Sequence, residues 1–164
     1  MKKFIAFLMA ALMLVCLVSC GEPKEKEFTS EKGLTITLTE SFKEAQYEGY
    51  TICYDSPTVA IFVLKEDFSL LAGLENYTLA QYAELVHNAN SSKKPTAITE
   101  VEGLTCFEYT YLNTDDNTDY SYFTTMFKGD DAFWTVQFCS KTDKYDSCKA
   151  EMIKYAKSVD VTKD

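Results

Sequence analysis

The chain has 164 residues and a formal net charge of −9, from 16 lysines and 25 acidic side chains. It contains no arginine, and therefore lacks the planar guanidinium group that binds phosphate through two hydrogen bonds at once. An acidic surface also repels nucleic acid and anionic lipid headgroups. Composition and charge thus argue against a nucleic-acid partner and against phosphate recognition.

The first 19 residues have the organisation of an export signal. Two lysines follow Met1, and the 15 residues from Phe4 to Val18 carry no charge and no proline. A helix needs ~20 apolar residues to cross a hydrocarbon core of ~30 Å, so this run is too short to span a bilayer. We predict that residues 1–19 are a signal peptide, which is removed and takes no part in the fold.

The end of this segment, Leu17-Val18-Ser19-Cys20, resembles the lipobox of bacterial lipoproteins. The resemblance implies that Cys20 receives a diacylglyceryl group on its sulfur and becomes the N-terminus after cleavage. The chemistry requires a thiol because the thiolate is the nucleophile that takes the lipid. The alternatives are an ordinary signal peptide with an incidental cysteine, or an uncleaved anchor.

The residues that follow the lipobox are polar and charged. We predict that residues 20–31 form an extended, solvated tether and that residues 32–164 form the folded domain. Acyl chains on Cys20 would hold the protein at the membrane without a spanning helix. We therefore expect a lipid-anchored protein on the extracytoplasmic side of a bacterial cell membrane, with the covalent lipid and no further cofactor.

Strands are expected in the first part of the domain. Residues 33–42 alternate polar and apolar side chains, as a half-buried strand does, and residues 47–68 read as two strands around a turn at residues 55–57. The second of these, "TVAIFVL", is apolar on both of its alternating faces. Such a strand is typical of the centre of a sheet that is covered on both sides.

Residues 78–88 switch to helical spacing. Thr78 and Gln81 have the spacing of a capping box, in which each side chain bonds the other residue's backbone N–H. One face of this helix is predicted to be an apolar stripe, formed by Leu79, Tyr82, Leu85, Val86 and Ala89. A polar loop follows.

Strands resume as a three-stranded meander over residues 101–111, 119–130 and 131–140. Gly129-Asp130 suits a two-residue turn with glycine first. A last helix over residues 144–159 presents one apolar face, formed by Cys148, Met152, Tyr155, Ala156 and Val159. The order of elements predicts a single α+β domain, an antiparallel sheet flanked by helices in an α/β/α sandwich.

Four stretches resemble PsbP-like domains in their order and position: "GLTITLTESFKEA", "YTLAQYAELV", "VEGLTCFEY" and "EMIKYAKSV". That fold is shared by the photosystem II extrinsic protein, a nuclear import factor and many bacterial envelope lipoproteins. The resemblance covers most of residues 30–160 and implies a binding or assembly role rather than catalysis. It carries no functional residue, because no catalytic signature accompanies it.

Four cysteines remain after the signal peptide and Cys20: Cys53, Cys106, Cys139 and Cys148. An exported protein can form disulfides, and the polar segment between Cys139 and Cys148 makes this pair the candidate if a bridge forms. The alternative is that all four are small buried side chains. A zinc site is not expected, because no CxxC pair and only one histidine are present.

Asp115, Asn117 and Asp119 match the first three ligand positions of a calcium-binding EF-hand loop. The sixth position is Tyr120 where glycine is needed, and the twelfth is Met126 where glutamate is needed. We therefore predict a solvated hairpin loop and no metal site, with a loose calcium site as the alternative.

The strands beside that loop place four tyrosines on one face of the sheet. If Tyr111 pairs with Tyr120, then Tyr109 pairs with Tyr122, and all four share a face that we call the tyrosine face. We read it as a candidate binding face for a protein or a sugar-like ligand, because each ring offers apolar area and a hydroxyl. The alternative, which we favour, is that a helix covers these rings.

Three functional hypotheses follow. The first is a non-enzymatic lipoprotein that binds or scaffolds an envelope protein. The second is a lipoprotein that binds a small aromatic or sugar-like ligand on the tyrosine face. The third is an enzyme, which would require Cys53, Cys106 or His87 to meet a carboxylate in a cleft. No GxSxG motif or glycine-rich phosphate loop supports the third hypothesis.

Overall fold

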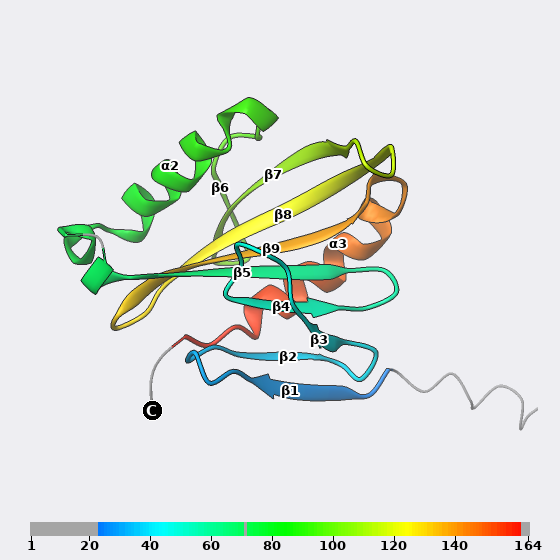
Figure 1. The fold of residues 1–164 in the computed structure, drawn as a ribbon, viewed down its shortest axis with the longest axis horizontal. Coiled ribbons are helices and arrows are strands. Elements are labelled where there is room, and N and C mark those ends of the chain that lie inside the picture. The colour runs from blue at the N-terminus through cyan, green and yellow to red at the C-terminus, as the bar shows by residue number, and fades with distance from the viewer. Residues whose placement is uncertain (1–22, 71, 162–164) are drawn as a thin grey trace, which may run out of the picture.

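The structure is a computed structural model that describes residues 23–70 and 72–161 (Figure 1). The predicted signal peptide and Cys20 lie outside these residues. Within them, neighbouring strands are antiparallel and form a two-stranded and a seven-stranded sheet. The small sheet pairs β1 (Glu25–Thr29) with β2 (Thr35–Thr39). The large sheet has the order β3 (Lys43–Ala45), β4 (Ile52–Asp55), β5 (Ala60–Asp67), β9 (Ala132–Lys141), β8 (Thr118–Lys128), β7 (Leu104–Asn113) and β6 (Thr99–Val101).

Two α-helices pack on opposite faces of the large sheet, α2 (Leu79–Ala89) and α3 (Thr142–Lys157). Three short 3-10 helices complete the described chain: η1 (Phe68–Leu70), η2 (Leu74–Asn76) and η3 (Ser91–Lys93). None of the helices in the described ranges is long and apolar enough to cross a membrane. The predicted α+β architecture, with a helix on each face of an antiparallel sheet, is confirmed.

The main core lies between the large sheet, α3 and the small sheet. Strand alternation places Trp134, Val136 and Phe138 of β9 on this side, and all three are almost completely buried. The predicted apolar face of the last helix packs against them through Cys148, Met152, Tyr155 and Ala156. The sequence pattern identified the buried faces of β9 and α3, because apolar residues recur with the period of a strand in β9 and with that of a helix in α3.

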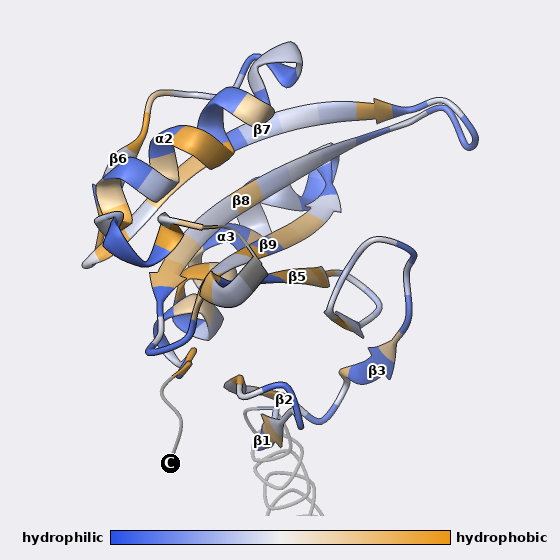
Figure 2. Cartoon of the chain, turned by 60° about the vertical axis from the view of Figure 1, so that its left-hand side comes forward, coloured by the Kyte–Doolittle hydropathy of each residue, from blue (hydrophilic) through white to orange (hydrophobic). Residues whose placement is uncertain are grey.

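A second, smaller core lies under α2. Its buried members come from α2, η2 and the strands β7, β8 and β9: Leu74, Tyr82, Ala83, Phe107, Tyr109, Met126 and Phe133. The capping box at the start of α2 is confirmed, since Thr78 Oγ1 accepts from the Gln81 N–H at 3.2 Å and the Thr78 N–H donates to Gln81 Oε1 at 2.9 Å. Figure 2 shows that α2 turns its apolar side toward the sheet.

The predicted tether is wrong over part of its length. Residues 25–29 form β1, and the Phe28 side chain is buried in the main core, with its ring 5.3 Å from that of Tyr54. The charged residues around Phe28 concealed this strand, because an edge strand with one buried position leaves its other side chains in water. The ordered chain therefore begins earlier than residue 32.

The turn after β8 lies one residue later than predicted, because Gly129 lies opposite Ala132 and the two central residues are Asp130 and Asp131. Lys128 ends β8 and Ala132 begins β9, so three residues connect them, and the Gly129 N–H donates to the Ala132 carbonyl at 2.9 Å. A Cβ on Gly129 would lie 2.9 Å from the carbonyl oxygen of Val161. Close approach of the C-terminal segment, rather than a central position in the turn, explains the glycine.

Candidate functional site

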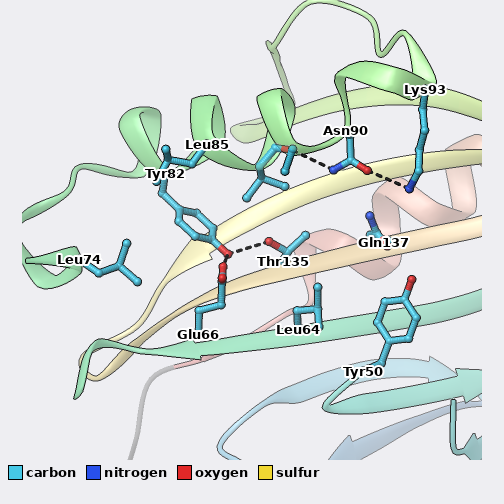
Figure 3. A pocket seen from close by; sticks show the side chains of 12 residues that line it. Tyr50, Leu64, Glu66, Leu74, Tyr82, Leu85, Asn90, Lys93, Thr135 and Gln137 are labelled. Carbon is cyan, nitrogen blue, oxygen red and sulfur yellow. Dashed lines mark hydrogen bonds between the residues drawn. The ribbon is translucent and has the colours of Figure 1, made fainter. Parts of the chain in front are cut away.

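A groove runs between α2 and strands β5 and β9, with a volume of about 390 Å³ (Figure 3). We call it the α2 groove. One wall is formed by the α2 residues Tyr82, Leu85, Val86 and Ala89. The floor is formed by Leu64, Glu66, Thr135 and Gln137, while Tyr50, Leu74, Asn90 and Lys93 complete the lining.

The groove exists because α2 covers only part of its side of the sheet. The helix packs on β7 and β8, where Tyr82 and Ala83 are buried. Leu85 belongs to the predicted apolar stripe, yet 47% of it is exposed. On β5, the same partial cover leaves Leu64 half-buried, so only one face of the predicted central strand is fully enclosed.

Glu66 and Tyr82 meet at one end of the groove. The Tyr82 hydroxyl donates to Glu66 Oε2 and lies 2.9 Å from Thr135 Oγ1. The Tyr82 ring stacks on Phe133, with centroids 4.2 Å apart and planes 5° apart. Burial and the hydrogen bond to Glu66 raise the pKa of Tyr82, so its hydroxyl stays protonated and acts as a fixed donor.

Lys93 lies at the other end of the groove. Its Nζ donates to Asn90 Oδ1 at 3.0 Å and sits 4.7 Å from the ring centroid of Tyr109. The Asn90 side chain in turn donates to the Val86 carbonyl at 2.8 Å. Burial lowers the pKa of Lys93. The end of α2 thus positions the ammonium group through Asn90 and the aromatic ring.

The tyrosine face has the predicted register but mixed exposure. Tyr109 pairs with Tyr122 and Tyr111 with Tyr120, and the Tyr109 and Tyr122 rings stack with centroids 4.6 Å apart. Tyr109 is buried, its hydroxyl accepting from Gln137 Nε2 at 3.1 Å, whereas Tyr111 is 46% exposed. The four tyrosines therefore do not act as one open surface. The role of the tyrosine face in binding stays a prediction.

The loop that carries Asp115 and Asn117 is a hairpin between β7 and β8, and Asp119 lies within β8. The Asp115 N–H donates to Asn113 Oδ1 at 3.0 Å, and the Tyr120 hydroxyl donates to Asp116 Oδ2 at 2.9 Å. In the parts of the chain that the structure describes, no group of three His, Cys, Asp or Glu side chains could hold a metal ion.

The candidate bridge between Cys139 and Cys148 is not formed in this structure. Both cysteines are free and buried, as are Cys53 and Cys106. Cys148 belongs to α3 and the main core, whereas Cys139 of β9 pairs with Tyr122 and follows Gln137 by two residues on the α2 side. Proximity in the sequence made this pair the candidate, but the sheet separates the two thiols.

The residues considered for catalysis have structural partners. His87 Nε2 lies 2.9 Å from the Thr96 carbonyl oxygen, which can only accept, so this nitrogen carries a proton. Burial is the main cause that raises the pKa of Cys53 and of Cys106, and it raises the pKa of Cys139 to about 11. These thiols are therefore protonated at neutral pH and are poor nucleophiles.

Comparison with known proteins identifies the fold but assigns no function. Neither protein-family models nor curated protein sequences give a match. The chain superposes on the solution structure of cyanobacterial PsbP (CyanoP) from Synechocystis sp. PCC 6803 with a TM-score of 0.56 and 10% identity, covering 87% of this chain and 95% of that one.

The fold is PsbP-like. A crystal structure from Bacteroides thetaiotaomicron VPI-5482 is also similar, with a TM-score of 0.56 and 13% identity, covering 85% of this chain and 49% of that one. At these identities the likeness concerns the PsbP-like fold alone. The α2 groove must therefore be interpreted from its own residues.

Sequence reasoning missed the polar residues of the groove. Glu66 follows Phe62 and Leu64 on the same side of β5, and Gln137 interrupts the apolar strand "AFWTVQF". A polar residue at a buried strand position is the signal that could have identified them. Lys93 gave no such signal, because it lies in a polar loop that only the tertiary structure brings to the sheet.

Proposed function

We propose that this chain is a lipid-anchored, extracytoplasmic binding protein without catalytic activity, and that the α2 groove is its binding site. The export signal and the lipobox at Cys20 support the anchor and the location. The PsbP-like fold is compatible with a binding role but does not assign one. The observation that carries the proposal is the groove itself.

The groove has the composition that small-ligand sites share. Its volume of about 390 Å³ falls within the ~300–1,000 Å³ typical of ligand pockets. Leu64, Leu85 and Val86 supply apolar surface, and a few polar groups project among them. Leu85 lines the groove with an exposed apolar side chain, which a bound ligand would cover.

The chemistry of the groove supports binding rather than catalysis. Its described lining residues include no histidine, cysteine or serine, and the Tyr82 and Thr135 hydroxyls bond each other. Lys93 lies at the end of the groove opposite the Glu66 carboxylate. A nucleophile paired with a general base is what covalent catalysis needs. The side chains present can instead orient a ligand through hydrogen bonds and charge.

Native mass spectrometry of the full-length protein, extracted from its membrane in mild detergent, tests the proposed site. We expect a small-molecule adduct on the wild type and its loss in Ala89→Trp, which fills the groove. Ser147→Trp, on the exposed side of α3, is the matched control and should keep the adduct. An adduct that survives Ala89→Trp would place the binding site elsewhere.

A second candidate function is the docking of an envelope protein. The exposed ring of Tyr111 on β7 favours it. Tyr111→Ala removes an exposed ring without disturbing buried Tyr109, so a partner captured by the wild type and lost with this variant would support docking at β7. Equal capture by both proteins would argue against it.

A further inference from the structure

The two ends of the α2 groove carry opposite charges. Glu66 supplies a carboxylate at one end and Lys93 an ammonium group at the other, and Figure 3 shows them on opposite sides of the hollow. No ion pair joins either group to another described residue. By contrast, Lys65 and Lys149 are paired with carboxylates. The groove therefore presents one unpaired charge of each sign to a ligand.

The local hydrogen bonds fix both charges in place. Tyr82 and Thr135 hold Glu66 by way of the Tyr82 hydroxyl, which occupies Oε2 and leaves Oε1 for another donor. The Lys93 ammonium donates one of its three N–H groups to Asn90, and the other two donate to no other described residue. Each end can accept one further charged group without rearranging its neighbours.

The spacing of the two ends can be obtained from α2. Tyr82 contacts Glu66 and Asn90 contacts Lys93, and these two residues are eight positions apart, or about 12 Å along a helix that rises 1.5 Å per residue. Allowing ~3 Å for a hydrogen bond at each end leaves about 6 Å for the ligand. An extended chain spans ~3.3–3.6 Å per residue, so two residues, at about 7 Å, match this gap and three are too long.

The middle of the groove offers apolar surface and one hydrogen-bond acceptor, which suit the side chains and backbone of a peptide. Leu64 on the floor and Leu85, Val86 and Ala89 on the wall offer apolar contact to side chains. Gln137 also lines the floor, where its carbonyl can accept from a backbone N–H. Apolar walls between two fixed charges favour a ligand with charged ends and an apolar body over a sugar, which carries hydroxyls throughout.

We propose that the α2 groove binds a peptide of two apolar residues with free termini, its amino group at Glu66 and its carboxylate at Lys93. This inference rests on the proposed function, because it assigns a ligand class to the same site. A terminal carboxylate would also stabilise the charged form of Lys93, which burial disfavours.

The test removes each charged terminus of the peptide and, separately, the protein side chain that is proposed to bind that terminus. Leucyl-leucine is titrated by calorimetry into the detergent-solubilised full-length protein, together with its N-acetylated and its C-amidated forms. Blocking either end should weaken binding to the wild type about fivefold or more. Acetylation should have no further effect in Glu66→Gln, and amidation none in Lys93→Met, because the partner charge is then already absent.

Matched controls keep the result interpretable. Glu66→Gln retains an acceptor for Tyr82, and Lys93→Met retains the aliphatic stem over Tyr109. Lys94→Met changes the adjacent exposed lysine, which does not line the groove, and should bind all three peptides as the wild type does.

Two outcomes would overturn the inference. If the blocked peptides bind as tightly as the free one, the termini are not recognised. If no peptide binds, the groove takes another class of ligand, and its function as a binding site then depends on the adduct experiment with Ala89→Trp, which uses no peptide.

Discussion

Cys139 and Tyr54 are buried acids, and the fold favours their protonated forms. Burial raises the pKa of the Cys139 thiol from 9.0 to about 11, and it raises the pKa of the Tyr54 hydroxyl from 10.0 to about 12. Between pH 9 and 12 the unfolded chain releases these protons while the folded chain retains them. The resulting stability is fully present below pH 9 and is lost as the pH rises toward 12.

We therefore expect the free energy of unfolding to fall above pH 9, by roughly 2–3 kcal/mol for each of the two groups once their folded pKa is passed. Urea denaturation at pH 8, 10 and 11 measures it as a falling midpoint with an unchanged slope. In Cys139→Ala the fall between pH 9 and 11 should be smaller. A midpoint that does not change over this range would contradict the prediction.

Among the elements, α2 depends most on local interactions. It packs on the smaller core and leaves Leu85 exposed, so tertiary contacts hold it less firmly than α3. Thr78→Ala removes the side-chain acceptor of its capping box, and we expect a loss of about 1 kcal/mol of unfolding free energy. Faster amide exchange in α2 should accompany it. Thr58→Ala, in the exposed β4–β5 turn, should leave both values unchanged.

A substitution in β1 tests whether the folded domain begins at this strand. Phe28 is its one buried residue and contacts Tyr54 across the main core. Phe28→Ala should lower the unfolding free energy by about 3 kcal/mol, since it leaves a cavity in a packed core. Exposed Glu27→Ala is the control. Equal stability of the two variants would mean that residues 25–29 act as the solvated tether first predicted.

The whole molecule has one end that a lipid on Cys20 would hold near the bilayer. Glu25 lies five residues after Cys20, and five extended residues span at most about 18 Å. In Figure 1 the start of β1 lies at the same end of the long axis as the β4–β5 turn and the β7–β8 hairpin, whereas the β8–β9 turn lies at the opposite end. The short connection should therefore orient the domain with the β7–β8 hairpin toward the membrane.

Fluorescence quenching by spin-labelled lipid measures this orientation. A label on Asp115→Cys, in the β7–β8 hairpin, should be quenched strongly, and one on Asp130→Cys, in the β8–β9 turn, only weakly. The buried native thiols should not react with the label. Equal quenching at both positions would mean that the lipid does not orient the domain.

The sequence by itself determined the elements whose signals are local. The capping box at Thr78, the meander register that pairs Tyr111 with Tyr120, and the apolar face of α3 all depend on spacing within one segment or between adjacent ones. These signals follow from the fixed periods of helices and strands, so they survive without knowledge of the fold. Together they were enough to predict a helix on each face of an antiparallel sheet.

The tertiary structure decided what lies between segments distant in the sequence. It placed Cys139 and Cys148 on opposite sides of the sheet, drew residues 25–29 into the main core, and left α2 short of β5. That last gap creates the α2 groove and brings Glu66 and Lys93 to its two ends. No local sequence pattern predicts that Glu66 and Lys93 line the same groove, because the packing of the whole chain determines which part of a sheet a helix covers.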